Sequence, residues 1–114
     1  MQSAACAPIY QAWFQGDPCT TGVEPRQTYA EGVALPHPPR GTQVLQAIRR
    51  HNGAMLAVQD EELLSGWRDM ARAGIFVEPT SALAVAGAWL ARDRADLIDP
   101  ADNVVILTTG NVFS

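Results

Sequence analysis

Two short groups of carboxylate, hydroxyl and amide side chains follow apolar runs in this sequence and could do chemistry. They are Glu78, Thr80, Ser81, Thr108, Thr109 and Asn111. The apolar runs at residues 75–77 and 104–107 predict parallel strands, and in open α/β folds ligands bind outside the carboxyl ends of such strands. The two groups are therefore candidates to hold a polar substrate or a ring nitrogen.

Both groups also have a purely structural interpretation. Thr80 or Ser81 can cap the first turn of a following helix, where Pro79 loses nothing by lacking an N–H. The polar segment 109–111 can be an ordinary turn, since Thr, Gly and Asn are common turn residues. The residue types alone leave the binding and the structural interpretations open.

Other kinds of site find little support. Cys6, Cys19, His37 and His51 lack the closely spaced ligand pairs of a structural zinc site. No local feature marks either cysteine as a nucleophile, and the isolated glycines form no phosphate-binding loop. We therefore predict no metal site and no residue of this chain as the catalytic nucleophile.

The composition excludes several classes of protein. The net charge is −4 and all eight basic side chains are arginine, so the chain contains no lysine. Scattered arginines on an acidic chain argue against nucleic-acid binding, and no apolar run is long enough for a membrane span. The first residues do not resemble a secretory signal, and two cysteines are too few for a disulfide scaffold. We expect a cytoplasmic protein.

The order of predicted elements is that of an α/β fold with a small parallel sheet and flanking helices. Apolar stripes at three- and four-residue spacing predict the helices, and short apolar runs predict the strands. The expected helices span residues 3–15, 42–52, 60–73 and 80–92, and the expected strands span residues 54–58, 75–77 and 104–107. A proline-rich connector at residues 36–41 cannot be helical.

The predicted sheet looks incomplete. The helix at 80–92 is small and apolar on every side, which predicts burial on every side. The run at 104–107 predicts a strand buried on both faces, as in parallel sheets. So few strands cannot cover these faces, so we expect residues 1–114 to be a single partial domain. Its exposed apolar faces should cause self-association or homodimer formation.

Five short blocks of this sequence, in this order and spacing, resemble threonine synthase and its close relatives. They are residues 2–9, 39–41, 57–62, 74–82 and 107–111. The most specific block is Phe-Val-Glu-Pro-Thr-Ser-Ala at 76–82, which is followed by the predicted strand and a Thr-Gly-Asn turn. The chain resembles the C-terminal third of such an enzyme, within the pyridoxal-phosphate-binding large domain of the tryptophan-synthase-β fold type.

This resemblance implies that the parent enzyme binds pyridoxal phosphate. In the family a lysine holds the cofactor as a Schiff base and a glycine-rich loop holds its phosphate, both upstream of the matched region. The resemblance places Thr109 at the pyridine nitrogen, with Thr108 as the fallback. A hydroxyl at that position leaves the nitrogen largely unprotonated, which favours elimination and replacement reactions.

The same resemblance assigns a polar shell around the ring. Glu78 matches an acid near the cofactor, Thr80 and Ser81 match the start of the helix that faces the ring, and Asn111 belongs to the turn. The implied reaction of the parent converts an amino-acid substrate, O-phosphohomoserine, with water to threonine and phosphate. Alternatives are a threonine dehydratase-like or cysteate synthase-like lyase, or a non-catalytic α/β interaction module.

The sequence departs from the family pattern in two places. Residues 112–114 are Val-Phe-Ser where the family often has Gly-Leu-Lys, which puts the substrate in doubt. The chain also has no lysine, so no Schiff base can form on its side chains. We therefore predict that this chain alone is inactive and binds no pyridoxal phosphate.

Overall fold

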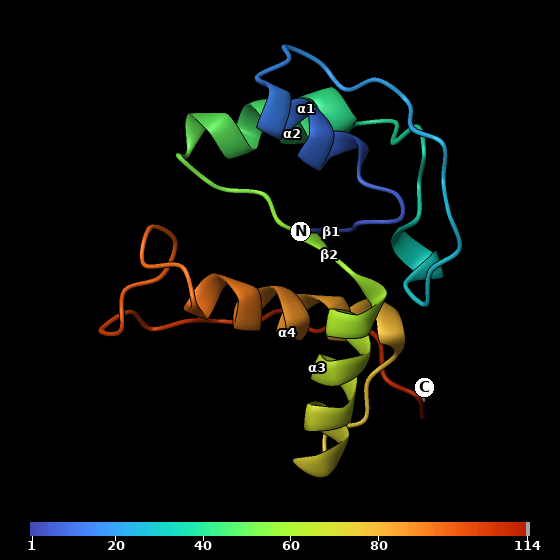
Figure 1. The fold of residues 1–114 in the computed structure, drawn as a ribbon, viewed down its shortest axis with the longest axis vertical. Helices are drawn as coiled ribbons and strands as arrows, with labels where there is room; N and C mark the ends of the chain where they lie inside the picture. Colours follow the sequence, from blue (N-terminus) through green and yellow to red (C-terminus); the bar gives the residue numbers. More distant parts are fainter. Residues whose placement is uncertain (114) are drawn as a thin grey trace.

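The computed structural model describes residues 1–113 as two pairs of helices on either side of a short strand pair (Figure 1). The elements are β1 (Gln2–Ser3), α1 (Pro8–Gln15), η1 (Glu31–Val33), α2 (Gly41–Arg50), β2 (Ala57–Val58), α3 (Asp60–Arg72) and α4 (Pro79–Arg92). Ser114, the last residue of the segment that departs from the family pattern, lies outside the described residues.

The two strands form a small parallel sheet, which confirms the predicted α/β class. Gln2 lies opposite Ala57 and Ser3 lies opposite Val58. Parallel strands need a crossover connection, and here α1 and α2 provide it and pack against each other on one side of the strands (Figure 1).

The prediction that a helix begins at residue 3 is wrong. Residues 2–3 form strand β1 instead, because Gln2 N donates to Leu56 O at 2.9 Å and Ala4 N donates to Val58 O at 2.8 Å. Helix α1 starts only at Pro8, whose ring disfavours a helical conformation for the residue before it. The strand is only two residues long, too short to show an alternating pattern in the sequence.

The other helices lie close to their predicted positions. Helix α2 begins at Gly41, the last residue of the predicted proline-rich connector, and ends at Arg50, two residues earlier than predicted. Asn52 then adopts a left-handed backbone with φ of 52°. Helix α3 begins with three acidic residues, which suit the positive end of its dipole. Among the described residues, no helix is both long and apolar enough to cross a membrane.

Helices α3 and α4 form the most extensive helix contact and carry most of the core below the strands (Figure 1). Gly66 of α3 allows the close approach, because a Cβ there would lie 3.1 Å from the backbone nitrogen of Ala86. Helix α4 buries Ala82, Leu83 and Ala86. We predicted that α4 is buried on every side, and the structure differs, because Trp89 is 40% exposed.

The predicted strand at residues 104–107 is absent. This segment belongs to no strand, and Val105 and Leu107 are 92% and 77% exposed. The predicted strand at 75–77 is reduced to an isolated antiparallel bridge between Val77 and Asn111. A strand buried on both faces needs neighbours on its edges and faces. Within residues 1–113 the segment 104–107 pairs with no strand, and of its four side chains only that of Ile106 packs against the core.

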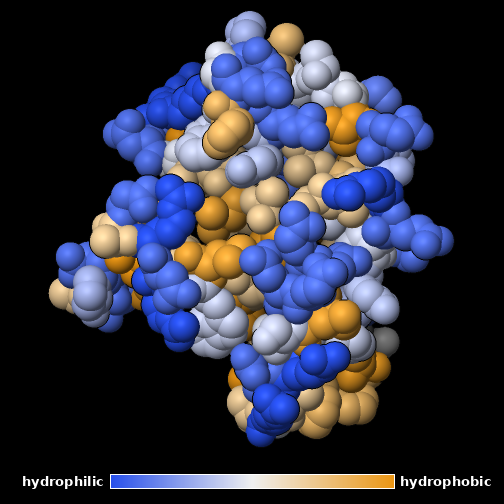
Figure 2. Space-filling model, in the orientation of Figure 1, coloured by the Kyte–Doolittle hydropathy of each residue, from blue (hydrophilic) through white to orange (hydrophobic). Residues whose placement is uncertain are grey.

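Exposed apolar side chains accompany this unpaired segment. Ile75, Phe76, Val112 and Phe113 are all about half exposed or more, and the Phe76 and Phe113 rings lie edge to face with centroids 5.7 Å apart. Figure 2 shows apolar surface at the lower end of the molecule, where α3 and the C-terminal segment lie. This is the exposed apolar surface that the sequence led us to expect.

Candidate functional site

The two predicted groups of polar residues meet where α4 begins. The Ser81 hydroxyl oxygen accepts hydrogen bonds from the backbone N–H groups of Thr109, at 3.2 Å, and Gly110, at 2.7 Å. The same oxygen lies 3.4 Å from the Thr109 hydroxyl oxygen. The Glu78 backbone N–H donates to the Gly110 carbonyl at 3.2 Å. The turn after residues 104–107 is therefore fixed directly against the first turn of α4.

The Glu78 carboxylate lies over the same turn. A Cβ at Gly110 would come within 2.6 Å of one Glu78 carboxylate oxygen, so the glycine makes room for this side chain. Asn111, the next residue, forms the isolated bridge with Val77. Its amide oxygen accepts from the Phe113 N–H at 2.9 Å, which tightens the following turn.

Helix α3 supports the site from behind. The indole N–H of Trp67 donates to the Val77 carbonyl at 2.7 Å, and Val77 is only 4% exposed. Val77 directly precedes Glu78, so this hydrogen bond fixes the chain as it enters the site.

The structure does not bring all the predicted residues together. Thr80 faces η1, because its hydroxyl oxygen would lie 3.1 Å from a Cβ added at Gly32. Thr108 lines a different, mainly apolar pocket of about 380 Å³ between α3, α4 and the C-terminal segment. Glu78, Ser81, Thr109 and Asn111 thus share one site, and Thr80 and Thr108 lie apart from it.

The helix-capping interpretation of Thr80 and Ser81 is wrong. The N-cap of α4 is Glu78, and no side chain makes a capping hydrogen bond there. The Ser81 hydroxyl accepts from the turn at residues 109–110 instead, and the side chain is buried, with 4% exposure. Ser81 therefore connects two segments that are far apart in the sequence.

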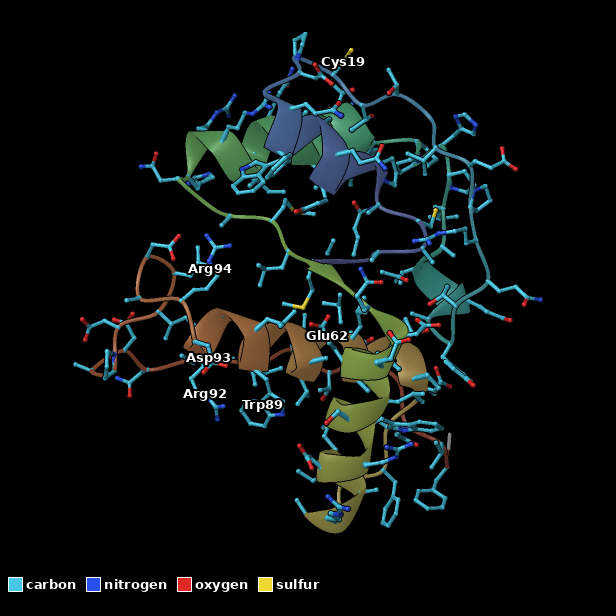
Figure 3. The ribbon with its side chains drawn as sticks, in the orientation of Figure 1. Cys19, Glu62, Trp89, Arg92, Asp93 and Arg94 are labelled. Carbon is cyan, nitrogen blue, oxygen red and sulfur yellow. The ribbon has the colours of Figure 1, made fainter. Side chains whose placement is uncertain are left out.

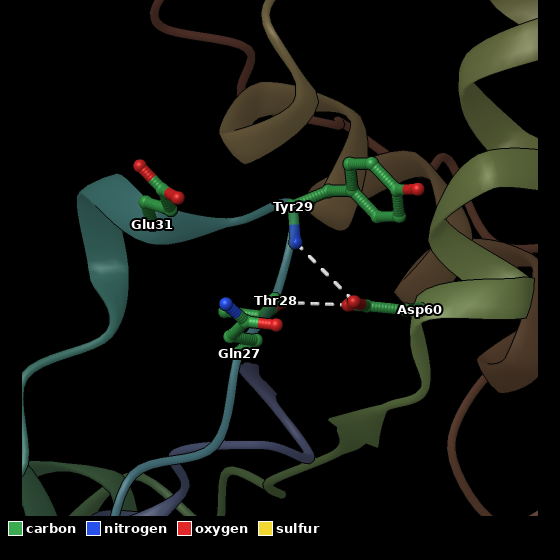
Figure 4. A pocket seen from close by; sticks show the side chains of 5 residues that line it. All are labelled: Gln27, Thr28, Tyr29, Glu31 and Asp60. Atoms are coloured by element: carbon green, nitrogen blue, oxygen red, sulfur yellow. Dashed lines mark hydrogen bonds between the residues drawn. The ribbon is translucent and has the colours of Figure 1, made fainter.

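A second polar cluster, at the start of α3, was missed by sequence reasoning (Figure 4). The Thr28 hydroxyl donates to one Asp60 carboxylate oxygen at 2.6 Å, and the Tyr29 N–H donates to the other at 3.2 Å. Since the Thr28 hydrogen is used in this way, Ser3 donates in the buried 2.9 Å contact between the Ser3 and Thr28 hydroxyls. The cluster joins β1, the loop before η1, and the start of α3.

An open pocket of about 440 Å³ adjoins this cluster. Figure 4 shows the side chains that line it, which are Gln27, Thr28, Tyr29, Glu31 and Asp60. Both Asp60 oxygens are already used within the protein, so this carboxylate holds the loop in place. The sequence signalled only that Asp60 begins a helix, because its partners lie about 30 residues away.

The remaining reactive groups lie apart from the first site. Cys6 is buried, and burial raises the pKa of its thiol, whereas Cys19 is exposed in the loop after α1 (Figure 3). In the segment after α4, hydrogen bonds from Arg94 hold the pKa of Asp96 below its ordinary value. Within residues 1–113, no three His, Cys, Asp or Glu side chains are grouped to hold a metal ion.

The site at the start of α4 fits one part of pyridoxal phosphate. Thr109 offers an exposed hydroxyl beside the buried Ser81, which suits the nitrogen edge of a pyridine ring. The successive N–H groups of Thr109 and Gly110 are occupied by Ser81, so they are not free to bind a phosphate. The chain also supplies no lysine to bind the aldehyde.

Comparisons with known proteins show the family to which this chain is similar. The family of pyridoxal-phosphate dependent enzymes matches residues 1–110. The chain is 37% identical to threonine synthase of Methanosarcina acetivorans, over 99% of this chain and 28% of the relative. It is 34% identical to threonine synthase of Mycobacterium leprae, over 96% of this chain and 28% of the relative. The chain thus spans little more than a quarter of the length of these relatives.

A solved structure supports the fold. The crystal structure of a threonine deaminase from T.th. matches with a TM-score of 0.65 and 27% identity, over 81% of this chain and 33% of that one. The arrangement of helices around the small parallel sheet is therefore part of a larger fold.

Proposed function

Because this chain belongs to the family of pyridoxal-phosphate dependent enzymes, we propose that it is the C-terminal part of a threonine synthase. In this proposal it lines the pocket around the pyridine ring. The observation that carries the proposal is the contact between the turn at residues 109–110 and the start of α4, which presents the Thr109 hydroxyl beside Ser81. The similarity to threonine synthases over nearly the whole chain supports the choice of reaction.

The parent enzyme would convert O-phosphohomoserine and water to threonine and phosphate. When bound, pyridoxal phosphate supplies the electron-withdrawing ring that stabilises negative charge on the substrate carbon. The task of Thr109 is to donate a hydrogen bond to the ring nitrogen, which keeps that nitrogen unprotonated. Glu78 contributes a carboxylate beside the same turn, and Asn111 holds the turn through its bridge with Val77.

The amine that binds the cofactor must come from outside this chain, since the chain has no lysine. We therefore propose that the 114-residue chain is inactive by itself and binds no pyridoxal phosphate. After the chain is incubated with pyridoxal phosphate and passed through gel filtration, the absorption spectrum of the chain should be unchanged. Retained cofactor on the isolated chain would contradict this part of the proposal.

Two neighbouring threonines test the site in the complete protein. Thr109→Val removes the proposed donor to the ring nitrogen, and Thr108→Val makes the same change in the apolar pocket. With ¹⁵N-labelled pyridoxal phosphate bound, Thr109→Val should shift the ring nitrogen resonance toward that of a nitrogen without a donor. If only Thr108→Val shifts the resonance, the ring-nitrogen role belongs to Thr108 and our assignment is wrong.

A threonine deaminase-like activity is the second candidate, because that enzyme is a structural neighbour. The two reactions differ in their products. A synthase releases phosphate from O-phosphohomoserine, whereas a deaminase releases ammonia from threonine. Measuring both products with the complete protein separates the two candidates.

The exposed apolar surface supports a proposal about the isolated chain. Val105, Leu107 and Phe113 are each more than three-quarters exposed, and large exposed apolar patches promote association. We expect the isolated chain to self-associate, as a homodimer or larger species, in sedimentation velocity experiments. A monodisperse monomer that melts cooperatively would favour a stand-alone, non-catalytic α/β module instead.

A further inference from the structure

We propose that Ser81 is a positioning residue that fixes the direction in which the Thr109 hydroxyl donates its hydrogen. This proposal rests on the proposed function and extends it, because it concerns how the partner of the ring nitrogen is held. Ser81 does not touch the ring in this proposal. It acts through Thr109 and the turn that carries it.

Ser81 holds the turn at residues 109–110 through a single oxygen atom. Two successive backbone N–H groups, of Thr109 and Gly110, point at one oxygen atom, the Ser81 hydroxyl oxygen. Successive N–H groups of this kind form a concave site for an acceptor, and here a buried side chain of the same protein fills it. Because Ser81 belongs to the first turn of α4, the helix holds the position of the Thr109 backbone.

The Ser81 hydroxyl has too few lone pairs to accept from all three of its neighbours. A serine hydroxyl has one hydrogen to donate and two lone pairs to accept. Both lone pairs of Ser81 are used by the two N–H groups, so Ser81 cannot also accept a hydrogen from Thr109. In the 3.4 Å contact between the two hydroxyls, Ser81 must therefore be the donor and Thr109 the acceptor.

The hydrogen of the Thr109 hydroxyl is left free by this arrangement. Since its oxygen accepts from Ser81, the hydrogen of Thr109 points elsewhere and is available to an acceptor outside this chain. An unprotonated pyridine nitrogen is such an acceptor, and a protonated one is not. The 3.4 Å contact is long for a hydrogen bond, so the N–H bonds hold the turn and this contact sets only the direction.

Amide hydrogen exchange on the chain itself tests whether Ser81 holds the turn. We expect Ser81→Ala to speed exchange of the Thr109 and Gly110 amides about ten-fold, as for the loss of one hydrogen bond. Ser81→Cys keeps the size of the side chain but accepts weakly, so it should speed the same exchange while the fold is kept. Thr80→Ala, in the same helical turn but facing η1, should leave both amides unchanged. Unchanged exchange in both Ser81 variants would overturn the proposal.

The ring nitrogen of the complete protein tests the direction. With ¹⁵N-labelled pyridoxal phosphate bound, Ser81→Ala should move the nitrogen resonance part of the way that Thr109→Val moves it. A shift with Thr109→Val but none with Ser81→Ala would overturn the positioning role and leave the proposed function intact. No shift with Thr109→Val would instead overturn the proposed function, while amide exchange still decides whether Ser81 holds the turn.

Discussion

Replacing Trp67 with phenylalanine should destabilise the protein and loosen the candidate site. The indole N–H of Trp67 makes a 2.7 Å hydrogen bond to the Val77 carbonyl, and Val77 is 4% exposed. Phenylalanine has no donor, so this buried carbonyl would lose its partner. Leaving a buried acceptor unpaired costs about 1–3 kcal/mol, which corresponds to a fall in Tm of about 5 °C or more for a domain of this size.

Trp89 provides a matched control for the same substitution. Trp89 is 40% exposed and its ring centroid lies 5.4 Å from the Arg92 guanidinium carbon, with both side chains at the surface of α4 (Figure 3). An exposed cation–π contact contributes about 0.5–1 kcal/mol. Trp89→Phe should therefore cost less than Trp67→Phe, although both variants exchange the same two ring systems.

Urea denaturation followed by circular dichroism measures the two free energies of unfolding. Circular dichroism is preferred to fluorescence because each variant removes a fluorophore. The protein concentration must be held constant, since self-association shifts apparent stability. If Trp67→Phe costs no more than Trp89→Phe, then the Trp67–Val77 hydrogen bond does not stabilise the entry to the site and our reasoning fails.

Four further perturbations test other parts of the structure. Gly66→Ala should destabilise the protein by about 1–2 kcal/mol in urea denaturation, because the added Cβ forces α3 and α4 apart; the exposed neighbour variant Ser65→Ala should cost nothing. Iodoacetamide should label Cys19 rapidly and Cys6 slowly, as seen by mass spectrometry. Burial raises the pKa of the Cys6 thiol, so the folded protein keeps this thiol protonated more strongly than the unfolded chain does. The free energy of unfolding should therefore be unaffected by Cys6 at neutral pH and should fall above about pH 8.5, where the unfolded thiol ionises. The variant Cys6→Ala should show a smaller fall. Asp60→Ala removes two hydrogen bonds from the loop before η1 and should speed proteolysis there, and unchanged cleavage would contradict its structural role.

The sequence predicted the helices well because their signals are local. Apolar stripes, the proline at the start of α4 and the acidic first turn of α3 each lie within the helix that they specify. Parallel pairing of β1 with β2 depends instead on segments more than 50 residues apart. The strand Gln2–Ser3 is too short to carry a pattern, and the prediction that a helix begins at residue 3 was wrong for that reason.

The apolar run at residues 104–107 shows a different limit of sequence reasoning. Its composition is that of a buried strand, but a strand forms only where a neighbour accepts its hydrogen bonds. The residue types indicated that this segment is suited to a buried strand, but the described chain does not supply a neighbouring strand to pair with it. Val105 and Leu107 are therefore exposed, whereas in a buried strand they would be covered.

The candidate site was predicted in part. Glu78, Ser81, Thr109 and Asn111 do meet at the start of α4, although the two parallel strands from which we expected this are absent from residues 1–113. Their role around a cofactor stays a prediction. The sequence could not separate Thr108 from Thr109, because only the backbone path decides which side chain faces Ser81. It also could not find the Ser3–Thr28–Asp60 cluster, whose members lie on three distant segments.

Mass spectrometry of the protein from its native source, after borohydride reduction, tests the central claim most directly. Reduction fixes pyridoxal phosphate permanently to the lysine that holds it. Since 12.3 kDa is 28% of about 44 kDa, we predict a protein of about 44 kDa with one pyridoxal phosphate on a lysine outside these 114 residues. A protein of 12.3 kDa without the cofactor would contradict the proposal that this chain works as part of a pyridoxal-phosphate enzyme.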